Sequence, residues 1–141
     1  MKPLLVAVDF SELSERALAY AVEHAEGSER KIDLLHVAQD ALPARAAAHA
    51  PPEVLEQIRE AERAEDESEM ARFLALLPDN RRGQGIIRRG PAAETICEVA
   101  GEGYGLLVLS THGRTGLSQF FIGSVAERVV RFSPIPVLVV R

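Results

Sequence analysis

Short runs of apolar residues recur along this chain, and they limit its fold more strongly than any other feature. Each run is rich in valine and leucine, a composition typical of strands that are buried on both faces of a parallel sheet. A weaker fifth run, at residues 85–89, ends in two arginines. The four clear runs cover residues 3–8, 32–37, 106–110 and 136–140.

The segments between these runs follow helical spacing, with an apolar residue at every third or fourth position. Ser11 is a suitable N-cap for the first helix, and Glu12 and Glu15 lie in its first turn. Pro134 and Pro136 prevent the last helix from continuing. The apolar stripes are Leu13, Ala17, Ala21 and Ala25 in the first helix, Ala93, Ile96, Cys97 and Ala100 in a later one, and Val125, Val129 and Phe132 in the last.

Residues 41–52 are rich in alanine and proline and are interpreted as a loop. From residue 53 to residue 77 the composition is strongly helical, and Pro52 can occupy the first position of this helix. Residues 60–69, with the sequence EAERAEDESE, are charged on almost every side. A solvated outer face is the favoured interpretation of this segment, and a surface for a recruited partner is the alternative.

The resulting order of elements predicts one α/β domain over residues 1–141. Strands that alternate with helices form a parallel sheet through right-handed crossovers, with helices on both faces. For five strands we expect the order 3-2-1-4-5. In such sheets ligands bind beyond the carboxyl ends of the strands, where the strand order reverses, and this point lies between the first and fourth strands.

The composition excludes several classes of function. The chain has 141 residues, a formal charge of -5 and a pI near 5.4. This charge argues against a general nucleic-acid binder, which needs a basic face, and against an anionic membrane surface as the partner. Cys97 is the only cysteine, so neither an internal disulfide nor a cysteine-based metal cluster is expected. A secretory signal and a run of membrane-spanning length are not visible, so a cytoplasmic location is expected.

The loop after the fourth run is rich in glycine and leads directly into a helix. It lacks the lysine of G-x-x-x-x-G-K-[ST], and no G-x-G-x-x-G follows the first run, which excludes the two commonest phosphate motifs. Gly113 can adopt a positive φ and lets a ligand approach the backbone. Gly123 and Ser124 begin a helix whose free N–H groups favour an anion, and Arg114 supplies a mobile cation.

Each of these residues also has a purely structural interpretation. Ser124 and Glu127 fit a capping box, and the glycines can simply shape a long loop. Asp9 can accept hydrogen bonds from ribose hydroxyls or form an Asx-turn into the next helix. His36 and His112 lie near strand ends, but neither belongs to a recognisable catalytic triad, so structural hydrogen bonding is the favoured role for both.

These residues and spacings resemble the universal stress protein family. The resemblance extends over essentially the whole chain, and its most specific part is the final segment, LSTHGRTGLSQFFIGSVAERVVRFSPIPVLVVR. Nucleotide-binding members of the family carry the motif G-x2-G-x9-G-[ST]. Here the motif falls on Ser110, Gly113, Gly123 and Ser124, with serine in place of the first glycine. The resemblance implies an adenine nucleotide alpha hydrolase-like fold with ATP as ligand.

The same resemblance implies roles for individual positions. Asp9 corresponds to the contact with ribose or adenine, and Ala7 and Val37 correspond to the walls of the adenine pocket. A Mg or Mn ion would be held mainly by phosphates and water. Family members are not efficient ATPases, and this chain shows no evident general base for phosphoryl transfer, so no catalytic residue is assigned. The implied triphosphate site comprises Ser110, Thr111, His112, Gly113, Arg114, Thr115, Gly116, Gly123, Ser124 and Val125.

Two functions from different classes follow. The first is a dimeric, ATP-binding stress-response or signalling module without strong catalytic activity, whose nucleotide state alters an unknown protein partner. The second is a dimeric interaction protein of the same fold that does not bind nucleotide. A weak ATPase or a binder of another small ligand is a third alternative. In the expected strand order the run from Pro136 to Val140 lies at a sheet edge, and the resemblance supports a homodimer through it.

Overall fold

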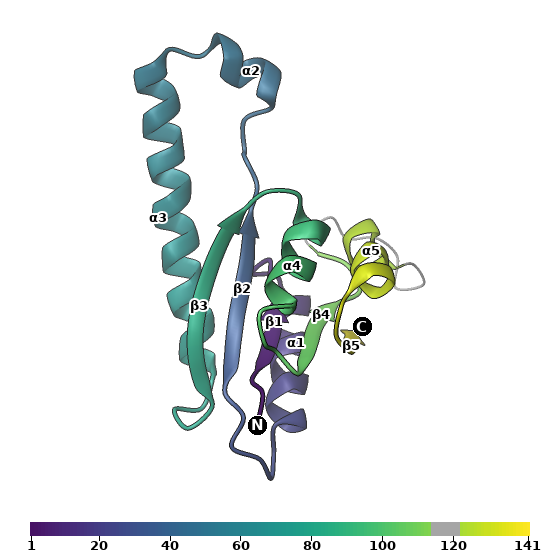
Figure 1. The fold of residues 1–141 in the computed structure, drawn as a ribbon. Helices are drawn as coiled ribbons and strands as arrows, with labels where there is room; N and C mark the ends of the chain where they lie inside the picture. Colours follow the sequence, from purple (N-terminus) through teal and green to yellow (C-terminus); the bar gives the residue numbers. More distant parts are fainter. Residues whose placement is uncertain (114–121) are drawn as a thin grey trace.

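A computed structural model describes residues 1–113 and 122–141 of the chain. Arg114, Thr115 and Gly116, which were predicted to contact phosphates, lie outside the described residues. The centre of the structure is a parallel sheet of five strands in the order β3-β2-β1-β4-β5 (Figure 1), which confirms the predicted topology. The strands are β1 (Leu4–Ala7), β2 (Ile32–Ala38), β3 (Arg82–Arg89), β4 (Leu106–Ser110) and β5 (Val137–Val140).

Helices cover both faces of the sheet, as predicted. One face packs against α1 (Glu12–His24) and the carboxyl-terminal part of α3 (Pro52–Leu76). The other face packs against α4 (Ala92–Ala100) and α5 (Ser124–Phe132). Alternate residues of β1 therefore enter different cores: Leu4 and Val6 contact the first pair of helices, and Leu5 and Ala7 contact the second.

Strand β3 begins three residues earlier than the predicted run, and its glycine at position 85 lets it pass close to α3. A Cβ atom on Gly85 would lie 2.7 Å from the Met70 Cγ atom, so a larger residue would push the helix off the strand. Met70 and Phe73 are the buried residues of α3, and both lie in its last two turns. The long helix is therefore attached to the sheet mainly through its carboxyl-terminal part.

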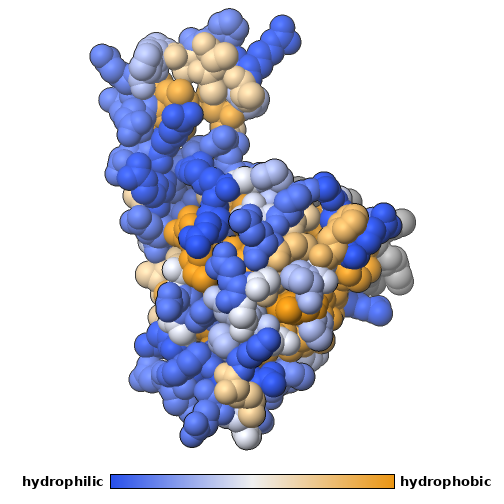
Figure 2. All heavy atoms as spheres, in the orientation of Figure 1, coloured by the Kyte–Doolittle hydropathy of each residue, from blue (hydrophilic) through white to orange (hydrophobic). Residues whose placement is uncertain are grey.

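The amino-terminal half of α3 and the short helix α2 (Ala44–His49) project beyond the sheet as an arm (Figure 1). The interpretation of residues 41–52 as a loop was wrong for α2, whose alanines favour a helix between two prolines. Pro52 does occupy the first position of α3, as predicted. Figure 2 shows a mainly hydrophilic arm with some hydrophobic atoms near its end.

The ends of the helices agree only partly with the sequence. Ser11 caps α1, because its side chain accepts a hydrogen bond from the Ser14 backbone N–H. Ser124 does not cap α5: Gly123 is the N-cap, and Ser124 is already the first helical residue. In the described residues, no helix combines the length and the apolar composition needed to cross a membrane.

The apolar stripe predicted for α5 is also wrong in part. Val129 is fully buried together with Ala126, but Val125 is 39% exposed and Phe132 is 63% exposed. The helix lies at the β5 end of the sheet and contacts α4 on one side, so only one narrow face is covered.

Candidate functional site

A cavity of about 580 Å³ opens at the carboxyl ends of β1, β2 and β4, where the strand order reverses. This is the predicted position for a ligand. The ten described residues that were predicted to contact nucleotide all line it, and their roles toward a ligand stay predictions. They are Ala7, Asp9, Val37, Ser110, Thr111, His112, Gly113, Gly123, Ser124 and Val125.

One part of the cavity is an apolar slot between β2 and α4. Leu35 and Val37 project from the strand, and Ala92 and Ile96 project from the helix. Buried apolar side chains of this kind suit a flat heterocycle, because such a ring buries apolar surface without requiring a charged partner.

Asp9 lies directly after β1 and is held by the start of α1. Its Oδ1 atom accepts hydrogen bonds from the Ser11 backbone N–H at 3.1 Å, from the Ser14 hydroxyl at 2.7 Å and from the Ser11 hydroxyl. The Ser14 hydroxyl also accepts a bond from the Asp9 N–H at 2.9 Å. The bond from Ser11 N–H confirms the Asx-turn interpretation, and the cluster fixes the direction of the carboxylate.

Gly113 contacts the same carboxylate from the opposite wall of the crevice. A Cβ atom at this position would lie 2.0 Å from the Asp9 Oδ2 atom, so only glycine lets the end of β4 approach Asp9 this closely. Its φ lies outside the left-handed region, so the positive φ that a glycine can adopt is not used here. The glycine is required for space and not for an unusual backbone conformation.

The start of α5 is fixed to the end of β4. The Gly123 N–H donates a hydrogen bond of 2.7 Å to the Thr111 carbonyl, and a Cβ atom on Gly123 would lie 3.1 Å from that oxygen. Ser124, Val125 and Ala126 follow in the first turn and border the cavity. A helix start leaves backbone N–H groups without intrahelical acceptors, so this edge of the cavity is suited to an anion.

Ser110 is the last residue of β4 and has extended backbone. Its hydroxyl donates a hydrogen bond of 3.1 Å to the His112 carbonyl, which closes a short turn at the strand end. The Thr111 hydroxyl and the His112 Nδ1 atom are 3.1 Å apart. Serine thus occupies the first motif position without left-handed geometry, and the hydroxyl of Ser110 stabilises the turn.

Sequence reasoning missed the role of Phe10. It has φ of +65°, the only positive value among the non-glycine residues described. Its buried ring packs on His36, with ring centroids 4.3 Å apart, and on the edge of Phe73 at 5.3 Å. No local pattern in the sequence distinguishes such a residue, since the turn depends on rings supplied by β2 and α3.

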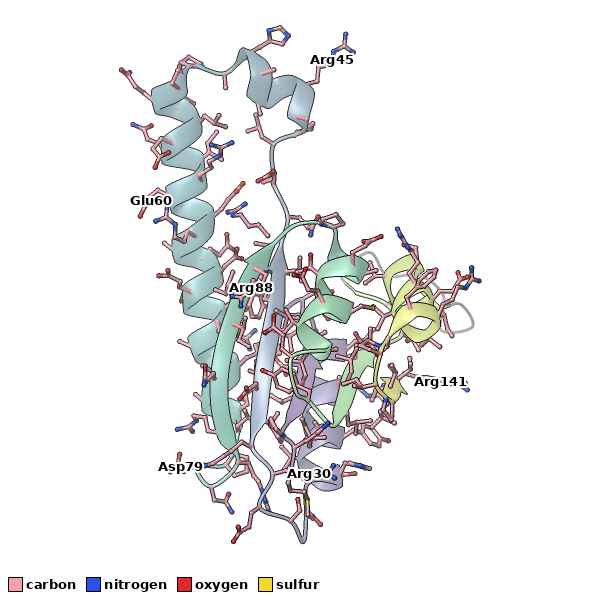
Figure 3. All side chains as sticks on the ribbon, in the orientation of Figure 1. Arg30, Arg45, Glu60, Asp79, Arg88 and Arg141 are labelled. Carbon is pink, nitrogen blue, oxygen red and sulfur yellow. The ribbon has the colours of Figure 1, made fainter. Side chains whose placement is uncertain are left out.

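The interpretation of residues 60–69 of α3 as a solvated outer face was incomplete. Glu62, Glu65, Asp66 and Glu69 line the cavity and form its acidic wall, so the segment is not only a solvated outer face. Glu60, by contrast, points away from the sheet (Figure 3). A signal for the wall was present, because Leu55, Ile58, Glu62, Asp66, Glu69 and Phe73 continue one stripe at helical spacing.

Several groups of the acidic wall are tied to the protein. The Ala41 N–H donates to Glu62 Oε1 at 3.1 Å, and Glu69 pairs with Arg72 at 2.8 Å. With Asp9, five carboxylates line the cavity, and none of its described lining residues is lysine or arginine. Among the residues that the structure describes, no group of three or more His, Cys, Asp or Glu side chains is placed to hold a metal ion.

Comparisons with known proteins agree with this architecture. The model of the universal stress protein family matches residues 1–141. A universal stress protein of Thermus aquaticus is 33% identical and covers 99% of this chain and 98% of its own length. The structure of protein MJ0577 of Methanocaldococcus jannaschii superimposes with a TM-score of 0.80 at 29% identity, and covers 99% of this chain and 96% of that one.

Two more distant structures share the fold and contain nucleotides. A universal stress protein of Archaeoglobus fulgidus in complex with dAMP has a TM-score of 0.69 at 19% identity, over 100% of this chain and 98% of that one. A universal stress protein in complex with cAMP has a TM-score of 0.67 at 23% identity, and the match covers 99% of this chain and 97% of that one. The family model, the relative from Thermus aquaticus and the shared strand order lead to one conclusion: this chain belongs to the universal stress protein family.

Proposed function

We propose that this chain is a binding module for adenine nucleotides, with ATP as its principal ligand. The observation that carries the proposal is the arrangement of three surfaces around one cavity. An apolar slot, a polar strand end and a helix start follow one another along it, and they suit a base, a sugar and phosphates in that order.

Each part of the ligand has a proposed contact. The base enters the slot beside Ala7 and Val37, and the sugar lies next to Asp9. The phosphates lie over Gly113 and the start of α5 at Gly123, where backbone N–H groups are available. A Mg or Mn ion is held mainly by the phosphates and by water. The dAMP and cAMP complexes of proteins with this fold support a nucleotide in general and leave the number of phosphates to experiment.

We further propose that the module acts through binding and not through catalysis. His36 and His112 are the histidines that line the cavity, and both interact with groups of the protein itself. None of the described lining residues is lysine or arginine, so Arg114 has no second cation among them to assist a phosphoryl transfer. The nucleotide state would then alter a protein partner in a stress or signalling response.

Calorimetric titration with Mg-ATP tests the proposal, and Gly123→Val is the decisive variant. Its side chain would meet the Thr111 carbonyl and His112, pushing the start of α5 off the end of β4, so binding should be lost. Gly101→Val is a matched control, because Gly101 caps α4 away from the cavity. Thermal unfolding of both variants separates a lost site from a lost fold. Unchanged ATP binding by a folded Gly123→Val protein would contradict the proposal.

Arg114→Ala should weaken binding without abolishing it, because backbone groups provide most of the phosphate contacts. The expected loss is that of one charge-assisted hydrogen bond, roughly 1.5–3 kcal/mol of binding free energy. A loss of all detectable binding in this variant would mean that the arginine, and not the helix start, holds the phosphates.

A second function, a family member that does not bind nucleotide, is favoured by one observation. Five carboxylates line the cavity and oppose a polyphosphate. Absence of heat with millimolar Mg-ATP, together with failure to compete with a fluorescent ATP analogue, would support this alternative. Recovery of binding in Ser110→Gly would then identify the serine as the cause, and continued absence of binding would point to the acidic wall.

We also propose a homodimer formed through β5. This strand is at the edge of the sheet, and Val137, Leu138 and Val139 are only half-buried. The neighbouring side chains Val130 and Phe132 of α5 are exposed. Antiparallel pairing with β5 of a second copy would cover the strand edge and this apolar surface together.

A further inference from the structure

His36 connects three separate elements at the floor of the crevice. Its Nδ1 atom lies 2.9 Å from the Val8 carbonyl oxygen, directly after β1. Its Nε2 atom lies 3.5 Å from the Asp66 Oδ1 atom on α3. The ring packs against Phe10, and the side chains of His36 and Asp66 are only 13% and 22% exposed.

Both ring nitrogens of His36 therefore face atoms that can only accept hydrogen bonds. A neutral imidazole carries one N–H group, while the imidazolium carries two. Because the Val8 carbonyl requires a donor at Nδ1, a neutral ring leaves the lone pair of Nε2 facing the Asp66 carboxylate. Only the protonated ring both donates to the Val8 carbonyl and carries the positive charge of the ion pair with Asp66, so this link between β2 and α3 depends on a proton.

This contact lies where α3 has little other attachment to the sheet. Met70 and Phe73 are the buried residues of the helix, and both follow Asp66 in the chain. Toward the amino terminus of α3, Glu62 bonds to the Ala41 N–H, but Ala41 belongs to the connection that leads into the arm. The pair formed by His36 and Asp66 thus lies between the buried residues of α3 and its projecting amino-terminal half.

Charged groups surround His36 in the cavity. The acidic wall of α3 and Asp9 share the cavity with it, and Glu69 is also paired with Arg72. On the adjacent strand β3, Arg89 is paired with Asp40 at 2.9 Å. The remaining titratable group that lines the cavity is His112. The groups that share the cavity with His36 are therefore Asp9, Glu62, Glu65, Asp66, Glu69 and His112.

We propose that His36 is a proton-dependent latch that holds the amino-terminal half of α3 against the crevice. In the protonated state it bridges Val8 and Asp66 and keeps the arm in place. Loss of the proton turns a donor at Nε2 into a lone pair, which repels the carboxylate and loosens residues 52–66. The latch acts in the ligand-free protein, so it does not depend on the proposed nucleotide binding.

Hydrogen exchange of the ligand-free protein tests the latch. Peptides covering residues 52–66 should lose protection when the pH is raised from about 5.5 to about 8, across the range where imidazoles titrate. Expressed as protection factors, which remove the intrinsic effect of pH on exchange, the loss should be about fivefold, the size of one modest hydrogen bond. Peptides from β1 and β4 should keep their protection.

Asp66→Asn is the decisive variant. An asparagine amide can donate to a neutral ring or accept from a charged one, so the pH dependence of residues 52–66 should disappear. His49→Asn is the matched control, because His49 is an exposed residue of α2, and its replacement should leave the pH dependence unchanged. Nitrogen-15 NMR chemical shifts of the His36 ring should show both ring nitrogens protonated at the lower pH and only Nδ1 protonated at the higher pH.

Three results would overturn the latch. One is equal protection of residues 52–66 at both pH values in the wild-type chain. Another is the same pH dependence in Asp66→Asn as in the wild type, and the third is loss of that dependence in His49→Asn. If Asp66→Asn is poorly folded, the NMR titration of the wild-type His36 ring decides, because a ring protonated only at Nε2 is incompatible with the latch.

Discussion

Asp9 and Gly113 together join the two walls of the crevice. The carboxylate of Asp9 is fixed by Ser11 and Ser14, and Gly113 leaves the space that its Oδ2 atom needs. Gly113→Ala would place a methyl group 2.0 Å from that oxygen, so either the Asp9 carboxylate must leave its hydrogen bonds or the segment after β4 must move. The expected cost is about 1–3 kcal/mol of unfolding free energy, measured with urea.

A double-mutant cycle separates this clash from a general effect of alanine. In an Asp9→Ala background, Gly113→Ala should cost much less, because the oxygen that it would meet is gone. Gly101→Ala serves as control, since Gly101 has right-handed helical backbone and its nearest neighbour would be 3.3 Å away. Equal costs in the two backgrounds would show that Gly113 is not required by Asp9.

Residue-scale features divide clearly into those the sequence could and could not predict. The N-cap at Ser11 was predictable, because a hydroxyl followed by glutamates has a local meaning. The left-handed Phe10 was not, since its conformation is stabilised by His36 and Phe73 from distant elements. The motif glycines line the cavity, and the close approach of the Asp9 carboxylate to Gly113 had no local signal in the sequence.

At the scale of elements, α3 is both a packing helix and a wall of the candidate site. Its length was predictable from composition, whereas its acidic wall was hidden because charges on every side obscured the inward stripe. The small helix α2 was missed because nearby prolines resemble loop signals in so short a segment. Four strands were predictable because each is a local apolar run, whereas the mostly polar β3 gave only a weak signal. The strand order followed from the rules for parallel connections.

The acidic wall gives a prediction that depends on ligand charge. Glu65→Gln removes one negative charge from the cavity lining and should raise the affinity for ATP about two- to threefold, after salt screening is considered. The gain should be smaller for AMP, which carries fewer charges. Glu60→Gln is the matched control on the outward face of the same helix (Figure 3), and it should have little effect on either ligand.

Titrations of both variants with ATP and AMP at two salt concentrations would check this expectation. The difference between the two ligands should shrink as salt rises, because exposed charges are screened. Equal gains for ATP and AMP in Glu65→Gln would mean that the wall does not distinguish ligands by charge. Binding that is absent for both ligands in every variant would instead contradict the proposed nucleotide site.

Over the whole molecule, charge and apolar surface are segregated. Residues 53–69 of α3 contain eight acidic and two basic side chains, a net charge of −6, whereas the entire chain carries −5. The rest of the molecule is therefore close to neutral. The exposed apolar side chains Ile122, Val125, Val130 and Phe132 lie on or next to α5, whose buried face belongs to the same core as β5. The acidic arm is attached next to the other edge of the sheet, at β2 and β3.

This segregation favours the proposed dimer through the β5 edge, because a second acidic arm would repel the first while the nearly neutral edge would not. Val139→Lys places a charge on the half-buried edge strand and should shift the protein from dimer to monomer in light scattering at high micromolar concentration. Val54→Lys, at an exposed position on the arm, is the matched control and should leave the dimer mass unchanged. A wild-type protein with monomer mass, or a dimer that tolerates Val139→Lys, would exclude β5 as the interface.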